Sequence, residues 1–394
     1  DGLEHLYAGT GAGAASDSDT CFNIALGCNA GCSLNEGDSN ILIGCHAGRC
    51  VSSGFLNVAI GRFAGALRTT GQYGVMFGDQ AATAKNSLRD IAIGVSAGYG
   101  GCQGATGDDN ISIGHEAGKC HTTGGCNIFM GVYAGKCTST GSYNLLFGNN
   151  TGRNLTTGSK NIALGKDAMK DGTVTGSRNI AIGENAALCL AGGFYNVMFG
   201  FNAGKCISGG GNNVAIGACA GLKNTGQGGN VFIGGSAGCN STGSCNVFIG
   251  LSAGEKQGGH HYNTYIGHKA ACDQSQGNSN VAIGFNVCLP INTGTGVSKQ
   301  LAIGHNDKQW IVGNCDYNVG IGTTNPKTDF QVGSHYGVVG GGGTFTAAAG
   351  VAHTINEYTI ASTDFKTAEY TIFANTGNKI QSQKLLVMQD GTTA

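Results

Sequence analysis

Cysteine is the residue type with the most chemical potential in this chain, which has 17 cysteines among 394 residues. Some recur at a fixed distance, since Cys28 and Cys45 are 17 residues apart and so are Cys120 and Cys137. Cysteines in register on neighbouring coils of a repeat would have Cα atoms about 5 Å apart, within disulfide range. Free thiols stacked as small apolar fillers fit the same spacing. Both interpretations stay open, whereas zinc is not indicated, because no Cys-x-x-Cys pair has a second pair nearby.

Serine and histidine motifs of the kind that enzymes use are also present. Ser96, Ser236 and Ser252 each lie in Gly-x-Ser-x-Gly, the pattern of a hydrolase nucleophile. They occupy the same place in three copies of one repeat, and no helix is expected after them. His260 and His261 lie in a spacer of turn-forming residues, and the acidic residues are scattered singly. We therefore expect no enzyme activity, no metal site and no cofactor.

The repeat itself is clearest in residues 57–65, Asn-Val-Ala-Ile-Gly-Arg-Phe-Ala-Gly. With the fifth residue, glycine, as anchor, eleven of the seventeen intervals between copies are 17 residues long. A short fixed period predicts a solenoid, in which each coil buries its apolar face only by stacking on its neighbours. The eighteen anchors are Gly27, Gly44, Gly61, Gly78, Gly94, Gly114, Gly131, Gly148, Gly165, Gly183, Gly200, Gly217, Gly234, Gly250, Gly267, Gly284, Gly304 and Gly322.

Each copy contains a three-residue apolar segment before the anchor, which predicts a short β-strand. The first and third residues of this segment share one face of the strand, and both are apolar in nearly every copy. The middle residue points the other way and is also apolar or small, so both faces would be buried. We expect one face to line the coil interior and the middle residue to form a column between chains of an oligomer. The largest members of this interchain column are Met76, Phe129, Met198, Phe232, Phe248 and Tyr265.

Asparagine precedes the strand in fifteen of the eighteen copies. In stacked coils equivalent residues lie about 4.8 Å apart, so each asparagine could hydrogen-bond the asparagines above and below it. The pattern predicts a structural ladder along one edge of the solenoid. Its representative members are Asn57, Asn127, Asn144, Asn161, Asn213 and Asn230.

Three segments follow from the extent of the repeat. Residues 1–19 are rich in Gly, Ala and Ser and form a linker or a poorly packed first coil, and residues 20–333 form the shaft. Residues 334–394 predict a small β module with candidate recognition aromatics: Tyr336, Tyr358, Phe365 and Tyr370. The net charge of −1 without a block of Lys or Arg gives no reason to expect nucleic acid as a partner. The sequence has no run of 18 apolar residues, so we expect no membrane insertion.

The unit Asn-[Ile/Val]-Ala-Ile-Gly-x-x-Ala-Gly resembles the head repeats of trimeric autotransporter adhesins, and even more the longer repeats of bacteriophage fibre proteins. Residues 318–326, Asn-Val-Gly-Ile-Gly-Thr-Thr-Asn-Pro, are similar to a segment that ends phage fibre shafts. Residues 365–372 and 381–394 resemble a small β module of phage structural proteins. The resemblance implies an all-β, left-handed parallel β-roll, here of about eighteen coils, in three intertwined chains. It places the protein on a virion, as in marine phages and cyanophages.

These observations lead to the expectation of a non-enzymatic tail fibre that serves as a rigid spacer and contacts the host. Its partners would be two further copies of itself, other particle or baseplate proteins, and a glycan or protein on the host surface. A trimeric adhesin head on a bacterial cell surface is the alternative from the same structural class. A polysaccharide-degrading tailspike is a third reading, disfavoured because no groove of carboxylates is indicated.

Overall fold

The computed structural model shows an all-β chain that divides into two units, Asp1–Val339 and Gly340–Ala394. Strands are the only regular elements among the residues that the structure describes. Those residues are 4–17, 20–83, 86–100, 105–225, 228–272, 277–289, 298–306, 308–327, 329–332, 336–338, 366–375 and 380–389. For the last three ranges only the backbone is described.

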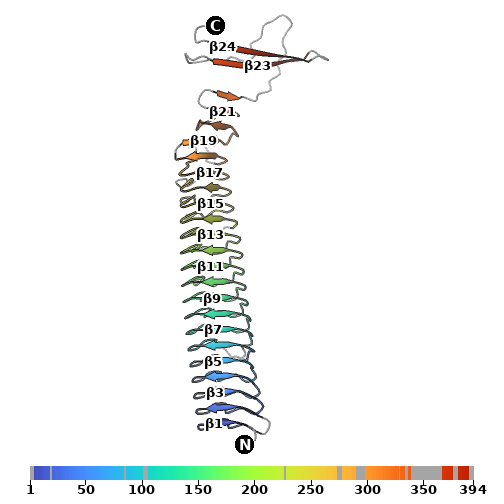
Figure 1. Ribbon diagram of the computed structural model, residues 1–394, viewed down its shortest axis with the longest axis vertical. Helices are drawn as coiled ribbons and strands as arrows, with labels where there is room; N and C mark the ends of the chain where they lie inside the picture. Colours follow the sequence, from blue (N-terminus) through green and yellow to red (C-terminus); the bar gives the residue numbers. More distant parts are fainter. Residues whose placement is uncertain are drawn as a thin grey trace. The chain divides into compact units, whose positions relative to one another are not determined.

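The strands of the first unit follow one another at the period of the repeat (Figure 1). Their bounds are β1 Leu6–Ala8, β2 Ile24–Leu26, β3 Ile41–Ile43, β4 Val58–Ile60, β5 Val75–Phe77, β6 Ile91–Ile93, β7 Ile111–Ile113, β8 Ile128–Met130, β9 Leu145–Phe147, β10 Ile162–Leu164, β11 Ile180–Ile182, β12 Val197–Phe199, β13 Val214–Ile216, β14 Val231–Ile233, β15 Val247–Ile249, β16 Thr264–Ile266, β17 Val281–Ile283, β18 Leu301–His305, β19 Lys308–Gly313, β20 Val319–Ile321, β21 Phe330–Val332 and β22 Tyr336–Val338.

Strands β1 to β18 form a β-solenoid of about 16 turns with a period of about 17 residues. Each strand pairs in parallel with the next, and equivalent residues face each other, as Ala59 faces Met76 between β4 and β5. The predicted short strand and the predicted stacking of coils are thus confirmed. Parallel, in-register stacking also means that every column of the sequence repeat becomes a physical row of side chains along the stack.

The middle strand residue lies inside its own coil, which corrects the predicted interchain column. Met76, Phe129, Met198, Phe232, Phe248 and Tyr265 are at most 1% exposed within a single chain. They pack with the alanines that follow each anchor glycine by three residues, such as Ala64 and Ala134. The physical reason is the width of the coil, whose interior holds one large side chain for each strand. No surface of these residues is left for another chain.

The anchor glycine is required where the strand ends and the coil turns a corner. Gly27 has φ +133°, a conformation that residues with a side chain rarely adopt, and the other anchors of the regular coils are similar. A Cβ atom at Gly27 would lie 2.6 Å from the carbonyl oxygen of Gly44 in the next coil. Both the backbone angle and the close stacking therefore select glycine at this position.

The two ends of the solenoid are built differently. At the start, β1 pairs in parallel with β2, so residues 6–8 of the predicted linker or first coil form a stacked first strand. At the other end, β19 pairs antiparallel with β18 and β20 antiparallel with β19. The copy at Gly322 therefore follows a strand of this antiparallel meander and does not extend the parallel stack. Reversing the chain in this way ends the parallel stack, as expected for a capping segment.

The boundary of the last segment also shifts. Strand β22 pairs with β21, which pairs in parallel with β20, so Tyr336 belongs to the first unit and not to the C-terminal one. The described residues of the second unit form two strands, β23 (Lys366–Asn375) and β24 (Ile380–Gln389), which pair antiparallel along their whole length.

Candidate functional site

The most extended surface feature is a row of apolar side chains on the outer face of the stacked strands. The first and third residues of each strand from β2 to β18 point out of the coil, and Thr264 is the one polar residue among them. Phe77, Phe147 and Phe199 are 54%, 49% and 51% exposed, and Ile216 is 37% exposed. We call this row, the first and third residues of β2 to β18, the outer stripe.

Apolar surface of this extent is unusual on an isolated chain. The largest exposed apolar patch of a typical monomer measures about 300–600 Å². From β2 to β18 the outer stripe carries two apolar residues for each strand except β16, which has Thr264, and it holds no charged residue. Sequence reasoning had found that both faces of the strand are apolar, and the structure shows that the face left open is that of Val58 and Ile60, not that of Ala59.

A row of aromatic side chains borders the outer stripe, and the sequence analysis missed it. Tyr73, Tyr143, Tyr195 and Tyr262 each stand two residues before a strand and are between 48% and 64% exposed. The Tyr195 hydroxyl lies 2.6 Å from Nη1 of Arg178 in the preceding coil, and the guanidinium lies 5.2 Å from the ring centroid. The sequence carries the signal, because tyrosine recurs at this one place in five copies, the fifth being Tyr317 before β20.

The asparagines that precede the strands form a buried ladder inside one edge of the coils. Nδ2 of Asn144 donates to Oδ1 of Asn127 at 3.0 Å and to the carbonyl oxygen of Gly158 at 2.9 Å. Oδ1 of Asn144 in turn accepts from the backbone N–H of Asn161 at 3.0 Å. All six asparagines named from the sequence lie in this ladder and are buried: Asn57, Asn127, Asn144, Asn161, Asn213 and Asn230.

The ladder lacks a side chain at Gly74, and a buried arginine fills the space. Nη2 of Arg68 donates to the carbonyl oxygen of Ser87 at 2.5 Å, the role that an asparagine Nδ2 has in the regular coils. In the next coil the ladder residue is Asp90, whose carboxylate accepts from the Ser87 hydroxyl and from the backbone N–H of Asn110. Burial lowers the pKa of Arg68 to about 10, and the charge of Asp90 opposes this shift. The arginine remains charged at neutral pH.

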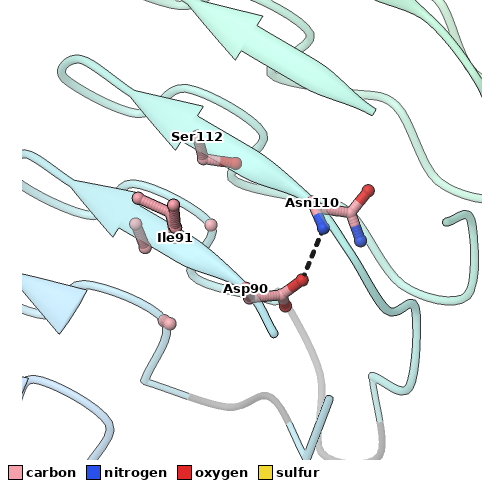
Figure 2. Close-up of a pocket in the computed structure, with 7 residues that line it drawn as sticks. Asp90, Ile91, Asn110 and Ser112 are labelled. Atoms are coloured by element: carbon pink, nitrogen blue, oxygen red, sulfur yellow. Dashed lines mark hydrogen bonds between the residues drawn. The ribbon is translucent and has the colours of Figure 1, made fainter. Parts of the chain in front are cut away.

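A small internal space beside Asp90 is not a binding site. It is lined by Ala82, Asp90, Ile91, Ala92, Gly98, Asn110 and Ser112, and Figure 2 shows the backbone N–H of Asn110 donating to the Asp90 carboxylate. The space does not admit a water-sized molecule. Its origin is the small middle residues of two successive strands, Ala92 and Ser112, which leave the coil interior underfilled.

Charged side chains on the surface pair across neighbouring coils. Arg62 meets Asp79 at 2.9 Å, and Lys136 and Lys119 meet Glu116 at 2.5 and 2.7 Å. Hydrogen bonds from Lys119 and Lys136 lower the pKa of Glu116 to about 2. The Arg62–Asp79 and Lys136–Glu116 pairs connect adjacent coils, whereas Lys119 and Glu116 lie in the same coil.

The cysteines named from the sequence lie side by side as thiols. The backbone N–H of His46 donates to the carbonyl oxygen of Cys28 at 2.8 Å, which puts Cys28 and Cys45 in register. The N–H of Cys120 donates to the carbonyl oxygen of Lys136 at 2.9 Å, which does the same for Cys120 and Cys137. The neighbour relation predicted from the 17-residue spacing is thus present.

The candidate recognition aromatics are not brought together by anything that the structure describes. Tyr336 is in β22 of the first unit, and Tyr370 is in β23 of the second. Tyr358 and Phe365 lie outside the described residues.

In the described part of the chain, no three side chains of the metal-binding types His, Cys, Asp and Glu gather in one place. No helix suited to crossing a bilayer occurs there either. Comparison with protein-family models, curated proteins and solved structures found no match.

Proposed function

We propose that this protein is a non-enzymatic structural fibre of a phage particle, in which three copies assemble along the outer stripe. The observation that supports it most directly is the uncharged apolar face that runs from β2 to β18. Strands that are apolar on both faces are typical of sheets covered on both sides. One side is covered by the coil itself, and the other side requires a partner of the same length and period. A second and a third copy of this chain meet that requirement.

The threefold symmetry and the left-handed coil belong to the proposal through the resemblance to fibre and adhesin repeats. In a threefold arrangement the outer stripes of the three chains face a common axis, and the row of Phe77, Phe147 and Phe199 lies at or near it. The tyrosine row of Tyr73 and Tyr195 then lies at the rim of the interface, where an aromatic ring packs while its hydroxyl stays in water. Because the middle strand residues are buried inside each coil, contacts between chains would be made by the first and third strand residues.

In this proposal the solenoid acts as a rigid spacer on the virion, and recognition belongs to the C-terminal segment. The columns of the coils are constrained by stacking, which leaves little freedom for a specific binding surface. The partners are other particle or baseplate proteins and a glycan or protein of the host surface. A trimeric adhesin head on a bacterial cell surface is the alternative that the same assembly would serve.

The assembly is tested by placing charges on the outer stripe. The variant with Ile216→Lys and Ile233→Lys puts two like charges on neighbouring coils, at positions 37% and 36% exposed in the single chain. We expect it to sediment as monomers, because three copies would bring six buried unpaired charges to one axis. Leu251→Lys is the matched control: it is 54% exposed but lies beyond the anchor glycine, off the stripe. Monomeric wild-type protein would refute the assembly.

The functional part is tested with an antibody against the solenoid. Immunogold electron microscopy of purified phage particles and of bacterial cells distinguishes the two locations. Labelling of a fibre on the particle supports the proposal, and labelling of the cell envelope in the absence of particles supports the adhesin. Recognition is tested with a chain that ends at Val339, the last residue of the first unit. It should keep the fibre and lose binding to host cells.

A further inference from the structure

Two pairs of cysteines occupy the same place in neighbouring coils, six residues after the anchor glycine. Cys120 and Cys137 follow β7 and β8, and Cys189 and Cys206 follow β11 and β12. Structural stacking alone does not require cysteine there, since Asn154 occupies the same place after β9. Cysteine therefore occurs twice in adjacent coils at a position that tolerates other residue types.

Backbone hydrogen bonds bring the members of each pair into register. The N–H of Cys120 donates to the carbonyl oxygen of Lys136 at 2.9 Å, and the N–H of Cys189 donates to that of Lys205 at 2.9 Å. This pattern is that of neighbouring residues in a parallel ladder, whose Cα atoms lie about 4.8 Å apart. Disulfides join cysteines whose Cα atoms are about 4.4–6.8 Å apart. Both pairs meet that requirement without movement of the backbone.

In each pair, one cysteine also raises the pKa of the other. Partial burial raises the pKa of Cys120, and the neighbouring Cys137 raises it further. Burial likewise raises the pKa of Cys189, followed by the effect of Cys206, which also exchanges a hydrogen bond with it. Cys120 is exposed and the other three are partly exposed, so a small oxidant reaches them from solvent.

We propose that Cys120 and Cys137, and likewise Cys189 and Cys206, form disulfides in an oxidising medium and so tie neighbouring coils of the solenoid together. With a small-molecule disulfide such as oxidised glutathione, one cysteine thiolate attacks a glutathione sulfur and releases the first glutathione. The second cysteine thiolate then attacks the sulfur of its neighbour and releases the other. Two protein S–H bonds and one glutathione S–S bond are replaced by one protein S–S bond and two glutathione S–H bonds.

Each link closes a loop of one repeat, and its consequence is local. By restricting the opened state, a closed loop of about 15 residues lowers the population of the locally opened coil about 100-fold. A solenoid opens coil by coil because each coil touches only its neighbours. The two links therefore protect the middle of the stack against progressive unzipping. This inference does not depend on the proposed function.

The test is peptide mapping of the full chain after incubation with oxidised glutathione and alkylation. Trypsin cleaves after Lys119, Lys136, Arg153, Arg178, Lys205 and Lys223, which separates all four cysteines onto different peptides. The substitutions Cys126→Ser and Cys219→Ser leave one cysteine on each of these peptides. We expect residues 120–136 linked to 137–153 and residues 179–205 linked to 206–223, with both links lost after reduction.

Cys245 is the internal control, because it is exposed and its neighbours in the adjacent coils are Gly229 and Tyr262. It should acquire glutathione without linking to another cysteine of its own chain. Four separately glutathionylated or alkylated peptides, with no linked pair, would overturn the proposal. Amide hydrogen exchange of β7, β8, β11 and β12 gives the second readout. Links that leave exchange as fast as in the reduced protein would contradict the tying of the coils.

Discussion

The guanidinium of Arg68 occupies the space in which the asparagine ladder lacks a side chain at Gly74. A Cβ atom at Gly74 would lie 3.0 Å from Nη2 and 3.1 Å from Cζ of Arg68. The arginine reaches this space from the preceding corner of the coil and donates to Ser87, as an asparagine at position 74 would. Asp90, in the following coil, supplies the opposite charge. Residues 68, 74 and 90 thus depend on one another.

This dependence predicts strong coupling between substitutions. Gly74→Asn alone should destabilise the solenoid, because its side chain would collide with a buried guanidinium. Adding Arg68→Leu and Asp90→Asn should recover most of the loss, since the chain would then have an uninterrupted ladder and Leu34 already shows that leucine fits the place of Arg68. Residues in contact commonly show coupling of about 0.5–3 kcal/mol. Urea denaturation of the single and triple variants measures this coupling. Additive effects would contradict the conclusion that Arg68 takes the place of a ladder asparagine.

The ladder predicts a large local effect from a single asparagine. Asn144→Ala removes the acceptor for the Asn161 N–H and the donor for the Gly158 carbonyl oxygen. Each buried group left without a partner costs about 1–3 kcal/mol. Hydrogen exchange in β8 to β10 should become faster, while the exposed Asn149→Ala should change it little. Equal exchange in the two variants would mean that the ladder does not hold the coils together.

Substitutions at two neighbouring residues of β8 distinguish the role of its inner face from that of its outer face. Phe129 is fully buried between Gly118 and Gly135, whose added Cβ atoms would lie 2.7 and 2.5 Å from its ring. Phe129→Ala should therefore cost about 3–5 kcal/mol of stability. Ile128→Ala, on the outer stripe, should leave the single coil nearly intact and weaken association of chains. Thermal unfolding and sedimentation of both variants check these two roles. A reversed pattern would mean that the middle strand residue, and not the first, contacts another chain.

The surface ion pairs predict a dependence on acid. The pKa of Glu116 is lowered from 4.5 to about 2 by Lys119 and Lys136, so the carboxylate stabilises the folded state above pH 4.5. That contribution is lost as the pH falls through this range toward 2, because the folded protein then takes up the proton. Glu116→Gln should remove this part of the pH dependence in β7 and β8. Hydrogen exchange at pH 5 and at pH 3 measures it, and identical pH profiles for the variant and the parent chain would speak against the effect.

Much of the solenoid is determined by the sequence alone, because stacking converts sequence period into spatial rows. The 17-residue recurrence of Gly27 and Gly44 predicts the stack, and their glycine identity predicts the corner conformation. The recurrence of Asn127 and Asn144 predicts the ladder, since equal residues at equal places must meet in register. The 17-residue spacing of Cys120 and Cys137 places their thiols together for the same reason.

Only the tertiary structure decided which face of each strand is the interior. Alternation shows that Val58 and Ile60 share a face opposite Ala59, but with apolar residues on both faces it does not say which one turns inward. The direction is set by how the corners at Asn57 and Gly61 close the coil, and this closure buries Asn57 and Ala59 on the same side. The fate of the Gly322 copy was undetermined for a similar reason, because β19 intervenes as an antiparallel strand. Arg68 could not be placed either, since only the closed coil shows that its side chain reaches the space left by Gly74.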